Sequence, residues 1–112
     1  MTTFKFSSLR KTTIFLPATM LSVSATALDF DQTQRLANQG DAIAQFDLGE
    51  IYEDGNGVNQ DYAKAFEWYQ KAANQGNARA QFNLGVLYDK GAGTRQDHTK
   101  AFEWYQKAAN QG

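Results

Sequence analysis

The chain has few of the side chains on which covalent crosslinks, metal sites and nucleophilic catalysis depend. Its 112 residues include no cysteine, one proline and one histidine. Without cysteine, neither a disulfide nor a thiolate metal site can form, so packing has to stabilise the fold. The lone histidine, His98, cannot assemble a metal site by itself, and we expect it on the surface. We therefore expect no metal and no cofactor.

Neither sign of charge dominates the chain, whose formal net charge is -1 at pH 7. Proteins that bind nucleic acids neutralise phosphates with clustered lysine and arginine residues. No such cluster occurs in this sequence. We expect that neither DNA nor RNA is a partner. The length is sufficient for one small domain.

The first 27 residues have the pattern of an export signal. Three basic residues and no acid precede a mostly apolar stretch at 14–23, which small residues at 24–27 follow. Ala25 and Ala27 form an A-x-A cleavage site. The apolar stretch is shorter than the roughly 18 residues of a membrane span. We expect a signal peptide at 1–27 that is cleaved after Ala27, and hence a periplasmic or secreted protein without a membrane span in its mature chain.

The part that remains after this cleavage, residues 28–112, lacks the usual nucleophiles. Besides cysteine, it contains no serine. A Ser-x-x-Lys motif occurs at Ser8–Lys11, but it falls within the expected signal peptide. Catalysis requires a nucleophile, a paired acid and base, or a metal. We therefore expect a protein that is not an enzyme.

An internal duplication dominates the mature part. Residues 40–75 align without gaps on residues 76–111, and the stretch at 64–76 recurs unchanged at 100–112. The period of 36 residues is typical of helical repeat proteins. Such repeats stack on one another, because a single repeat cannot cover its own apolar face.

Each copy has the periodicity of two amphipathic helices. In the first copy, apolar residues at i, i+4, i+7 and i+8 predict a helix over 42–54. A similar pattern predicts a second helix that starts after Asp61 and ends near Asn74. Four residues have the properties that caps of the first helices require, namely Asp41 and Asn77 at the N-termini and Gly55 and Gly91 at the C-termini.

Two features inside these helices predict how they pack. Gly49 and Gly85 lie within the first helices, where glycine costs about 1 kcal/mol relative to alanine. We expect these glycines to let a neighbouring helix approach closely. Each second helix contains a Trp-Tyr pair at helical spacing beside alanines, Trp68 with Tyr69 in the first copy. We expect both rings of each pair in the core.

The same period explains the segment that precedes the first copy. Phe30 falls on Phe66, and Gln32 and Thr33 stand in place of the Trp-Tyr pair. These replacements are expected where no partner helix precedes the segment to bury aromatic rings. We therefore predict an N-terminal capping helix at 28–39.

The pattern that the two copies share is specific. Both contain A-x-A-Q-F-x-L-G-x-x-Y, then G-x-G, then Q-D-x-x-K-A-F-E-W-Y-Q-K-A-A-N-Q-G. This closely resembles the Sel-one-like repeat (SLR) family, whose repeats are similar to tetratricopeptide repeats, and the resemblance covers residues 40–112. It implies an all-α fold, a short α/α solenoid of helix-turn-helix repeats with repeat 1 at 40–75 and repeat 2 at 76–112.

The resemblance also implies a function. Tetratricopeptide-like superhelices serve as interaction scaffolds, so we expect an exported protein-protein interaction module. Some cysteine-rich relatives have been described as binding or hydrolysing β-lactams, and a weak cell-wall or β-lactam-directed hydrolase is therefore the alternative. The missing cysteines and serines weigh against it. A remnant of a longer gene with no function of its own is a third interpretation.

Differences between the copies mark positions that packing does not dictate. Along the first helices these differences are spaced i, i+4, i+7 and i+11, which places them in one stripe. By the resemblance, first helices line a concave groove, so the stripe would face a partner protein or peptide; a solvated surface is the alternative. The candidate groove residues are Ile43, Phe46, Asp47, Glu50, Asp54, Arg79, Phe82, Asn83, Val86 and Lys90.

The C-terminal helix repeats an internal helix without any polar replacement. Its face of Ala101, Phe102, Ala108 and Ala109 matches a face that, in the internal copy, can pack on the following first helix. Two full repeats are also fewer than the number, about three, that such arrays need for stability. We expect the array to be open at this end, and to be covered by self-association, by a partner protein, or in a longer parent by further repeats.

Overall fold

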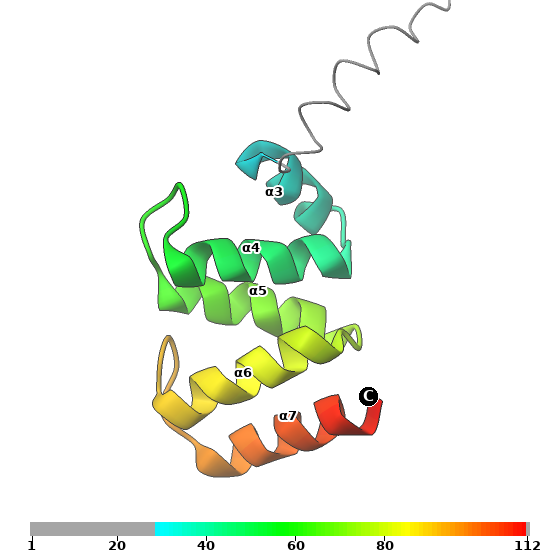
Figure 1. Ribbon diagram of the computed structural model, residues 1–112, viewed down its shortest axis with the longest axis vertical. Coiled ribbons are helices and arrows are strands. Elements are labelled where there is room, and N and C mark those ends of the chain that lie inside the picture. Colours follow the sequence, from blue (N-terminus) through cyan, green and yellow to red (C-terminus); the bar gives the residue numbers. More distant parts are fainter. Residues whose placement is uncertain (1–28, 112) are drawn as a thin grey trace, which may run out of the picture.

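The computed structural model describes residues 29–111, and the expected signal peptide at 1–27 lies outside them. This range forms five helices and no strand: α3 (Phe30–Asn38), α4 (Ala42–Asp54), α5 (Tyr62–Asn74), α6 (Ala78–Lys90) and α7 (His98–Gln111). Figure 1 shows them one below another from α3 (cyan) to α7 (red), with both hairpin loops on the same side. The predicted all-α array of hairpins is confirmed. None of these five helices has the length and hydrophobicity of a membrane span.

Local hydrogen bonds determine where the helices begin and end. The side chains of Asp41 and Asn77 each accept a hydrogen bond from the backbone N–H three residues further on, at 2.9 and 2.8 Å. Gly55 and Gly91 adopt the left-handed conformation that ends α4 and α6, each with a φ of 69°. An N-cap of this kind contributes about 1 kcal/mol. All four predicted caps are confirmed.

Within each hairpin, a tyrosine ring of the second helix lies against a glycine of the first helix. A Cβ atom added at Gly49 would stand 2.5 Å from Cδ1 of Tyr69, and one at Gly85 would stand 2.7 Å from Cε1 of Tyr105. The predicted reason for these glycines, the close approach of a neighbouring helix, is therefore confirmed. Tyr69 is fully buried, and its hydroxyl donates a hydrogen bond to Oε1 of Glu53 at 2.5 Å.

The prediction that both rings of each Trp-Tyr pair lie in the core is confirmed for Tyr69 and is wrong for both tryptophans and for Tyr105, which is half-buried at the open end of the array. Trp68 and Trp104 pack against the core but are only half-buried. Nζ of Lys71 lies 4.6 Å from the ring centroid of Trp68. Consecutive residues of a helix point about 100° apart, so only one ring of a pair faces the first helix of its own hairpin. Tyr69 occupies that position in the first hairpin.

An aromatic contact joins each second helix to the first helix that follows it. Phe66 of α5 makes an edge-to-face contact with Tyr88 of α6, with ring centroids 5.3 Å apart. Phe30 of α3 makes the same contact with Tyr52 of α4 at 6.1 Å. The capping helix α3 therefore packs on α4 as a second helix packs on the next hairpin.

A buried glutamine accompanies each of these contacts. Nε2 of Gln81 donates a hydrogen bond to the carbonyl oxygen of Ala73 at 3.1 Å. Gln111, on α7, donates in turn to Oε1 of Gln81 at 2.7 Å. Gln45 makes the matching bonds in the first hairpin. Both glutamines are 5% exposed. Within the described part of the chain, their amide groups bond to these partners and to no others.

The outer face of α7 is uncovered in the described part of the chain. Phe102 is 61% exposed, whereas its counterpart Phe66 is half-buried beside α6. Ala101 was predicted on the same face, and this is wrong. It is buried within its own hairpin, where its carbonyl oxygen lies close to Gly85 of α6.

Candidate functional site

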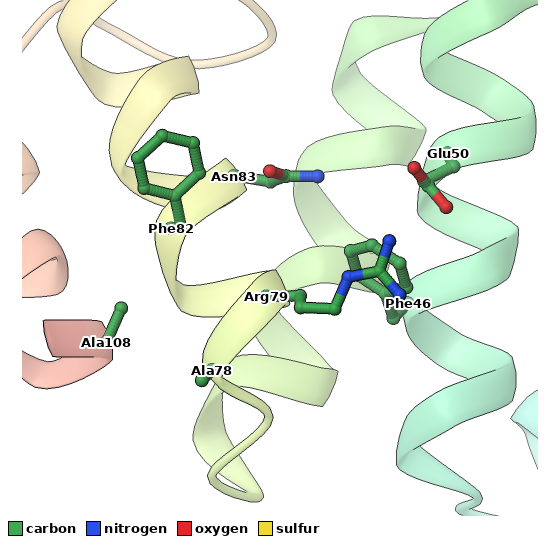
Figure 2. A pocket seen from close by; sticks show the side chains of 7 residues that line it. All are labelled: Phe46, Glu50, Ala78, Arg79, Phe82, Asn83 and Ala108. Carbon is green, nitrogen blue, oxygen red and sulfur yellow. The ribbon is translucent and has the colours of Figure 1, made fainter. Parts of the chain in front are cut away.

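Two hollows lie on the side of the molecule that the first helices α4 and α6 present. One, of about 310 Å³, is bounded by α4 and α6 and has a residue of α7 at its edge (Figure 2). The other, of about 330 Å³, is bounded by α4, the loop after it and α3. Glu50 lines both hollows, which therefore adjoin. We call the two hollows together the groove.

Most of the residues predicted to face a partner line the groove. These are Phe46, Asp47, Glu50, Asp54, Arg79, Phe82 and Asn83. Three others line neither hollow: Ile43 is 67% exposed, Val86 is half-buried, and Lys90 is exposed at the end of α6. The groove thus extends along α4 to its last residue, but along α6 only as far as Asn83.

The sequence pattern did not indicate five further residues that line the groove. They are Thr33 of α3, Ile51 of α4, Asn56 of the following loop, Ala78 of α6 and Ala108 of α7. The prediction rested on first-helix positions that differ between the copies. Residues of α3, α7 and the loop reach the groove only through the stacking of hairpins, and no local signal marks them.

The side chain of Arg79 extends from α6 toward α4 and covers Phe46 (Figure 2). Its guanidinium carbon lies 4.6 Å from the centroid of the Phe46 ring, a cation–π contact. Phe46 is consequently 3% exposed, so the expectation that its ring is open to a partner is wrong. Its counterpart Phe82 has no such cover and is 53% exposed.

Carboxylates dominate the charge of the groove. Burial raises the pKa of Asp47 and of Glu50 above the ordinary values, and the nearby guanidinium of Arg79 opposes this rise. Other carboxylates, among them that of Asp54, also raise the pKa of Glu50. Partly desolvated carboxylates that share a single arginine retain unmet capacity to bind a cation. The groove is therefore suited to a positively charged group of a partner.

A second polar cluster lies away from the groove, in the second hairpin. Nδ1 of His98 is 2.5 Å from Oδ1 of Asp89, and the hydroxyl of Tyr105 donates to Oδ2 of Asp89 at 3.4 Å. The His98 side chain is 71% exposed, as expected of a surface residue. The cluster lines neither hollow of the groove. Across residues 29–111, histidine and carboxylate side chains form no group of three or more that could hold a metal.

Comparison with known proteins identifies the repeat. The family model of the Sel1 repeat matches residues 42–77 and again residues 78–112. The pattern that resembled Sel-one-like repeats in the sequence is thus confirmed. No curated protein matches the chain.

Solved structures of similar proteins have the same fold. The chain is 46% identical to c5321, a protective antigen of uropathogenic Escherichia coli that displays an SLR fold; the match has a TM-score of 0.72 and covers 73% of this chain and 18% of that one. It is also 46% identical to a Sel1 repeat protein from Oxalobacter formigenes, with a TM-score of 0.64 over 65% of this chain and 30% of that one.

A third structure, cysteine rich protein B of Helicobacter pylori, matches with a TM-score of 0.74 at 24% identity, over 80% of this chain and 71% of that one. At this identity the likeness shows the fold alone. The chain spans less than a third of the length of the two relatives that it matches at 46% identity. With two matched repeats and a fold shared with SLR proteins, the chain belongs to the Sel1 repeat family.

Proposed function

We propose that the protein is an exported interaction module that binds a basic segment of a partner protein in the groove along α4. Sel1 repeat proteins are generally protein-interaction modules. The observation that carries the proposal is the position of Glu50, which lines both hollows next to further carboxylates. Export rests on the pattern of residues 1–27, with its basic start and its A-x-A site.

The chemistry of the partner follows from the groove. A lysine or arginine side chain placed beside Asp47 and Glu50 would compensate the desolvation that raises the pKa of both carboxylates. The backbone of an extended segment could hydrogen-bond the amides of Asn83 and Asn56, which line the two hollows. Electrostatic recognition of this kind favours fast association and weakens as salt is added.

The groove offers binding groups and lacks the nucleophiles that β-lactam hydrolysis uses. Its lining contains no serine, cysteine or histidine. Thr33 is the one hydroxyl residue there, and its Oγ1 already donates to the backbone oxygen of Asp29 at 3.1 Å. These observations favour binding over the nucleophilic hydrolysis of β-lactams.

The proposal is tested by selecting partners for the immobilised full chain from a display library of random short peptides. We expect enrichment of peptides rich in lysine and arginine. Their dissociation constants are then measured by calorimetry for the native chain and for Glu50→Gln, and we expect binding by the variant to be weaker by about tenfold or more, since charge-assisted hydrogen bonds contribute about 1.5–3 kcal/mol. Glu67→Gln, an exposed carboxylate of α5 outside the groove, is the matched control. Selection of acidic peptides, or equal affinities for Glu50→Gln and the native chain, would exclude this site.

A further inference from the structure

Helix α7 borders an uncovered hollow, which we call the socket, and the interface between α5 and α6 indicates what kind of helix fits it. An open hollow of about 420 Å³ is lined there by Phe82, Tyr105, Ala108 and Ala109. Their counterparts one repeat earlier are all 3% exposed or less, because α6 packs over them; these are Phe46, Tyr69, Ala72 and Ala73. Since residues 64–76 and 100–112 are identical, the second helices α5 and α7 present the same surface. The occupant that fits the socket is therefore a first helix with the residues of α6.

The chain contains one other helix of that kind, α4. Tyr52 and Gln45 of α4 stand at the positions of Tyr88 and Gln81 of α6. These are the residues that contact Phe66 and the Ala73 carbonyl in the internal interface. A second copy of the chain can thus offer α4 to the exposed Phe102 and Ala109 of α7.

The same arrangement covers two other exposed side chains. Ile43 of α4 stands one period before Arg79, which lies over the ring of Phe46. An α4 helix docked on α7 in the manner of α6 would place Ile43 over Phe82. Ile43, Phe82 and Phe102 are 67%, 53% and 61% exposed, and one docking event would bury Phe82 and cover part of the other two.

In the isolated molecule the corresponding side of α4 is covered by α3, which is shorter than α7 and covers less of α4. Helix α3 has 9 residues, whereas α7 has 14. At Gly93 the loop of the second hairpin lies directly against the backbone of Tyr62, the first residue of α5. At the equivalent Gly57, no described atom lies within 4 Å, since α3 begins only at Phe30. Helix α7 begins one turn earlier, at His98, and in the docked arrangement this turn would lie against the loop at Gly57 of the next copy.

We propose that the protein assembles head to tail, with α7 of one copy docking on α4 of the next and displacing its α3. On the α7 side the contact repeats the surface of α5, and on the α4 side it repeats the tyrosine and glutamine of α6, with Tyr52 and Gln45 at the positions of Tyr88 and Gln81. It is heterologous, because it joins different surfaces of the two copies, so it extends into open chains of molecules. The socket shares Phe82 and Ala108 with the groove, but the experiment changes Phe102 and Ile43, which lie outside the groove, so failure of this proposal is distinguishable from failure of the proposed function.

Sedimentation velocity of the full chain over a range of concentrations tests the proposal. We expect species larger than a dimer at high concentration. Phe102→Glu and Ile43→Glu change residues that are exposed in the single molecule, so both variants should fold, and each should remain monomeric. Asn110→Glu is the matched control, because its counterpart Asn74 stays exposed beside α6; it should assemble like the native chain.

Mixing the two monomeric variants then identifies the surfaces. The Ile43→Glu chain retains an intact α7, and the Phe102→Glu chain retains an intact α4, so a 1:1 mixture should form a heterodimer and nothing longer. A native chain that is monomeric at every concentration would overturn the proposal. Unchanged self-association of Ile43→Glu would do so as well, since it would indicate an interface that does not include α4, such as α7 against α7.

Discussion

The guanidinium of Arg79 lies over the ring of Phe46, with 4.6 Å between the guanidinium carbon and the ring centroid. This contact joins α6 to α4 across the groove and covers the ring of Phe46 in the first hairpin. The guanidinium is also the cation that opposes the rise in pKa of Asp47 and Glu50. One side chain thus affects both the packing and the charge of the groove.

Replacing this side chain should change both properties. In Arg79→Ala we expect the pKa values of Asp47 and Glu50 to rise further, because burial and the neighbouring carboxylates then act unopposed. Carboxyl carbon chemical shifts followed by NMR against pH measure this directly. Arg95→Ala, a change in an exposed loop residue, is the control. Unchanged pKa values in Arg79→Ala would mean that the guanidinium does not act on these carboxyls.

The buried phenol of Tyr69 predicts how stability depends on alkaline pH. Burial, and secondarily the hydrogen bond to Glu53, raise the pKa of Tyr69. Stability linked to such a group is fully present below the ordinary tyrosine pKa of about 10 and is lost as pH rises toward the raised pKa of the folded state. Urea unfolding at pH 8 to 11 should therefore show falling stability above about pH 10.

The Tyr69→Phe variant isolates this effect, because it keeps the ring against Gly49 and removes the ionisable hydroxyl. At neutral pH it should lose about 1 kcal/mol, the usual contribution of a hydrogen bond. Above about pH 10 its stability should fall less steeply than that of the native protein. Parallel pH profiles for the two proteins would contradict the role given to Tyr69.

The two glycines that face tyrosine rings should respond differently to alanine. Gly49→Ala places a methyl group 2.5 Å from the fully buried ring of Tyr69, and we expect a loss of about 1–3 kcal/mol from overpacking. Gly85→Ala meets the half-buried ring of Tyr105 at 2.7 Å and the Ala101 carbonyl oxygen at 3.2 Å, and the ring borders an open hollow into which it can move. The gain in helix propensity from alanine is the same at both positions, but the steric cost at Gly85 is smaller. We therefore expect a smaller loss of stability for Gly85→Ala than for Gly49→Ala. Urea denaturation midpoints compare the two, and a stabilised Gly49→Ala would refute the close contact.

Loss of a buried glutamine should weaken the contact between hairpins. In Gln81→Leu the Ala73 carbonyl and the Gln111 amide lose their partner, and we expect a cost of about 1–3 kcal/mol. The matched control is Gln106→Leu on the exposed side of α7, which should change stability by less than about 0.5 kcal/mol. Equal denaturation midpoints for the two variants would show that the hydrogen bonds of Gln81 contribute nothing.

Features set by neighbouring residues were predictable from the sequence. The bounds of α4 follow from Asp41 and Gly55, which act within one helical turn, and the 36-residue period indicated a stack of hairpins. The unequal burial of Trp68 and Tyr69 could not be predicted in this way. Adjacent residues have the same helical pattern, and the position of the partner helix decides which ring it covers.

The candidate groove was predictable only in part for a related reason. Variation between the copies pointed to the stripe on α4 and α6, but the cover that Arg79 places over Phe46 depends on how one hairpin stacks on the next. The same holds for Thr33 and Ala108, which α3 and α7 bring to the groove. Contacts between hairpins have no local signature in a single sequence.

The buried glutamines also bear on the shape of longer arrays. Each contact between a second helix and the next first helix contains the same amide, which donates to a carbonyl oxygen in the last turn of the second helix. A slip that breaks this bond would leave a buried amide unpaired, so the glutamine, together with the aromatic contact beside it, favours one rotation and rise at each contact. The pitch of the superhelix is therefore a property of one contact rather than of the number of repeats. Adding a hairpin lengthens the groove and leaves its curvature unchanged.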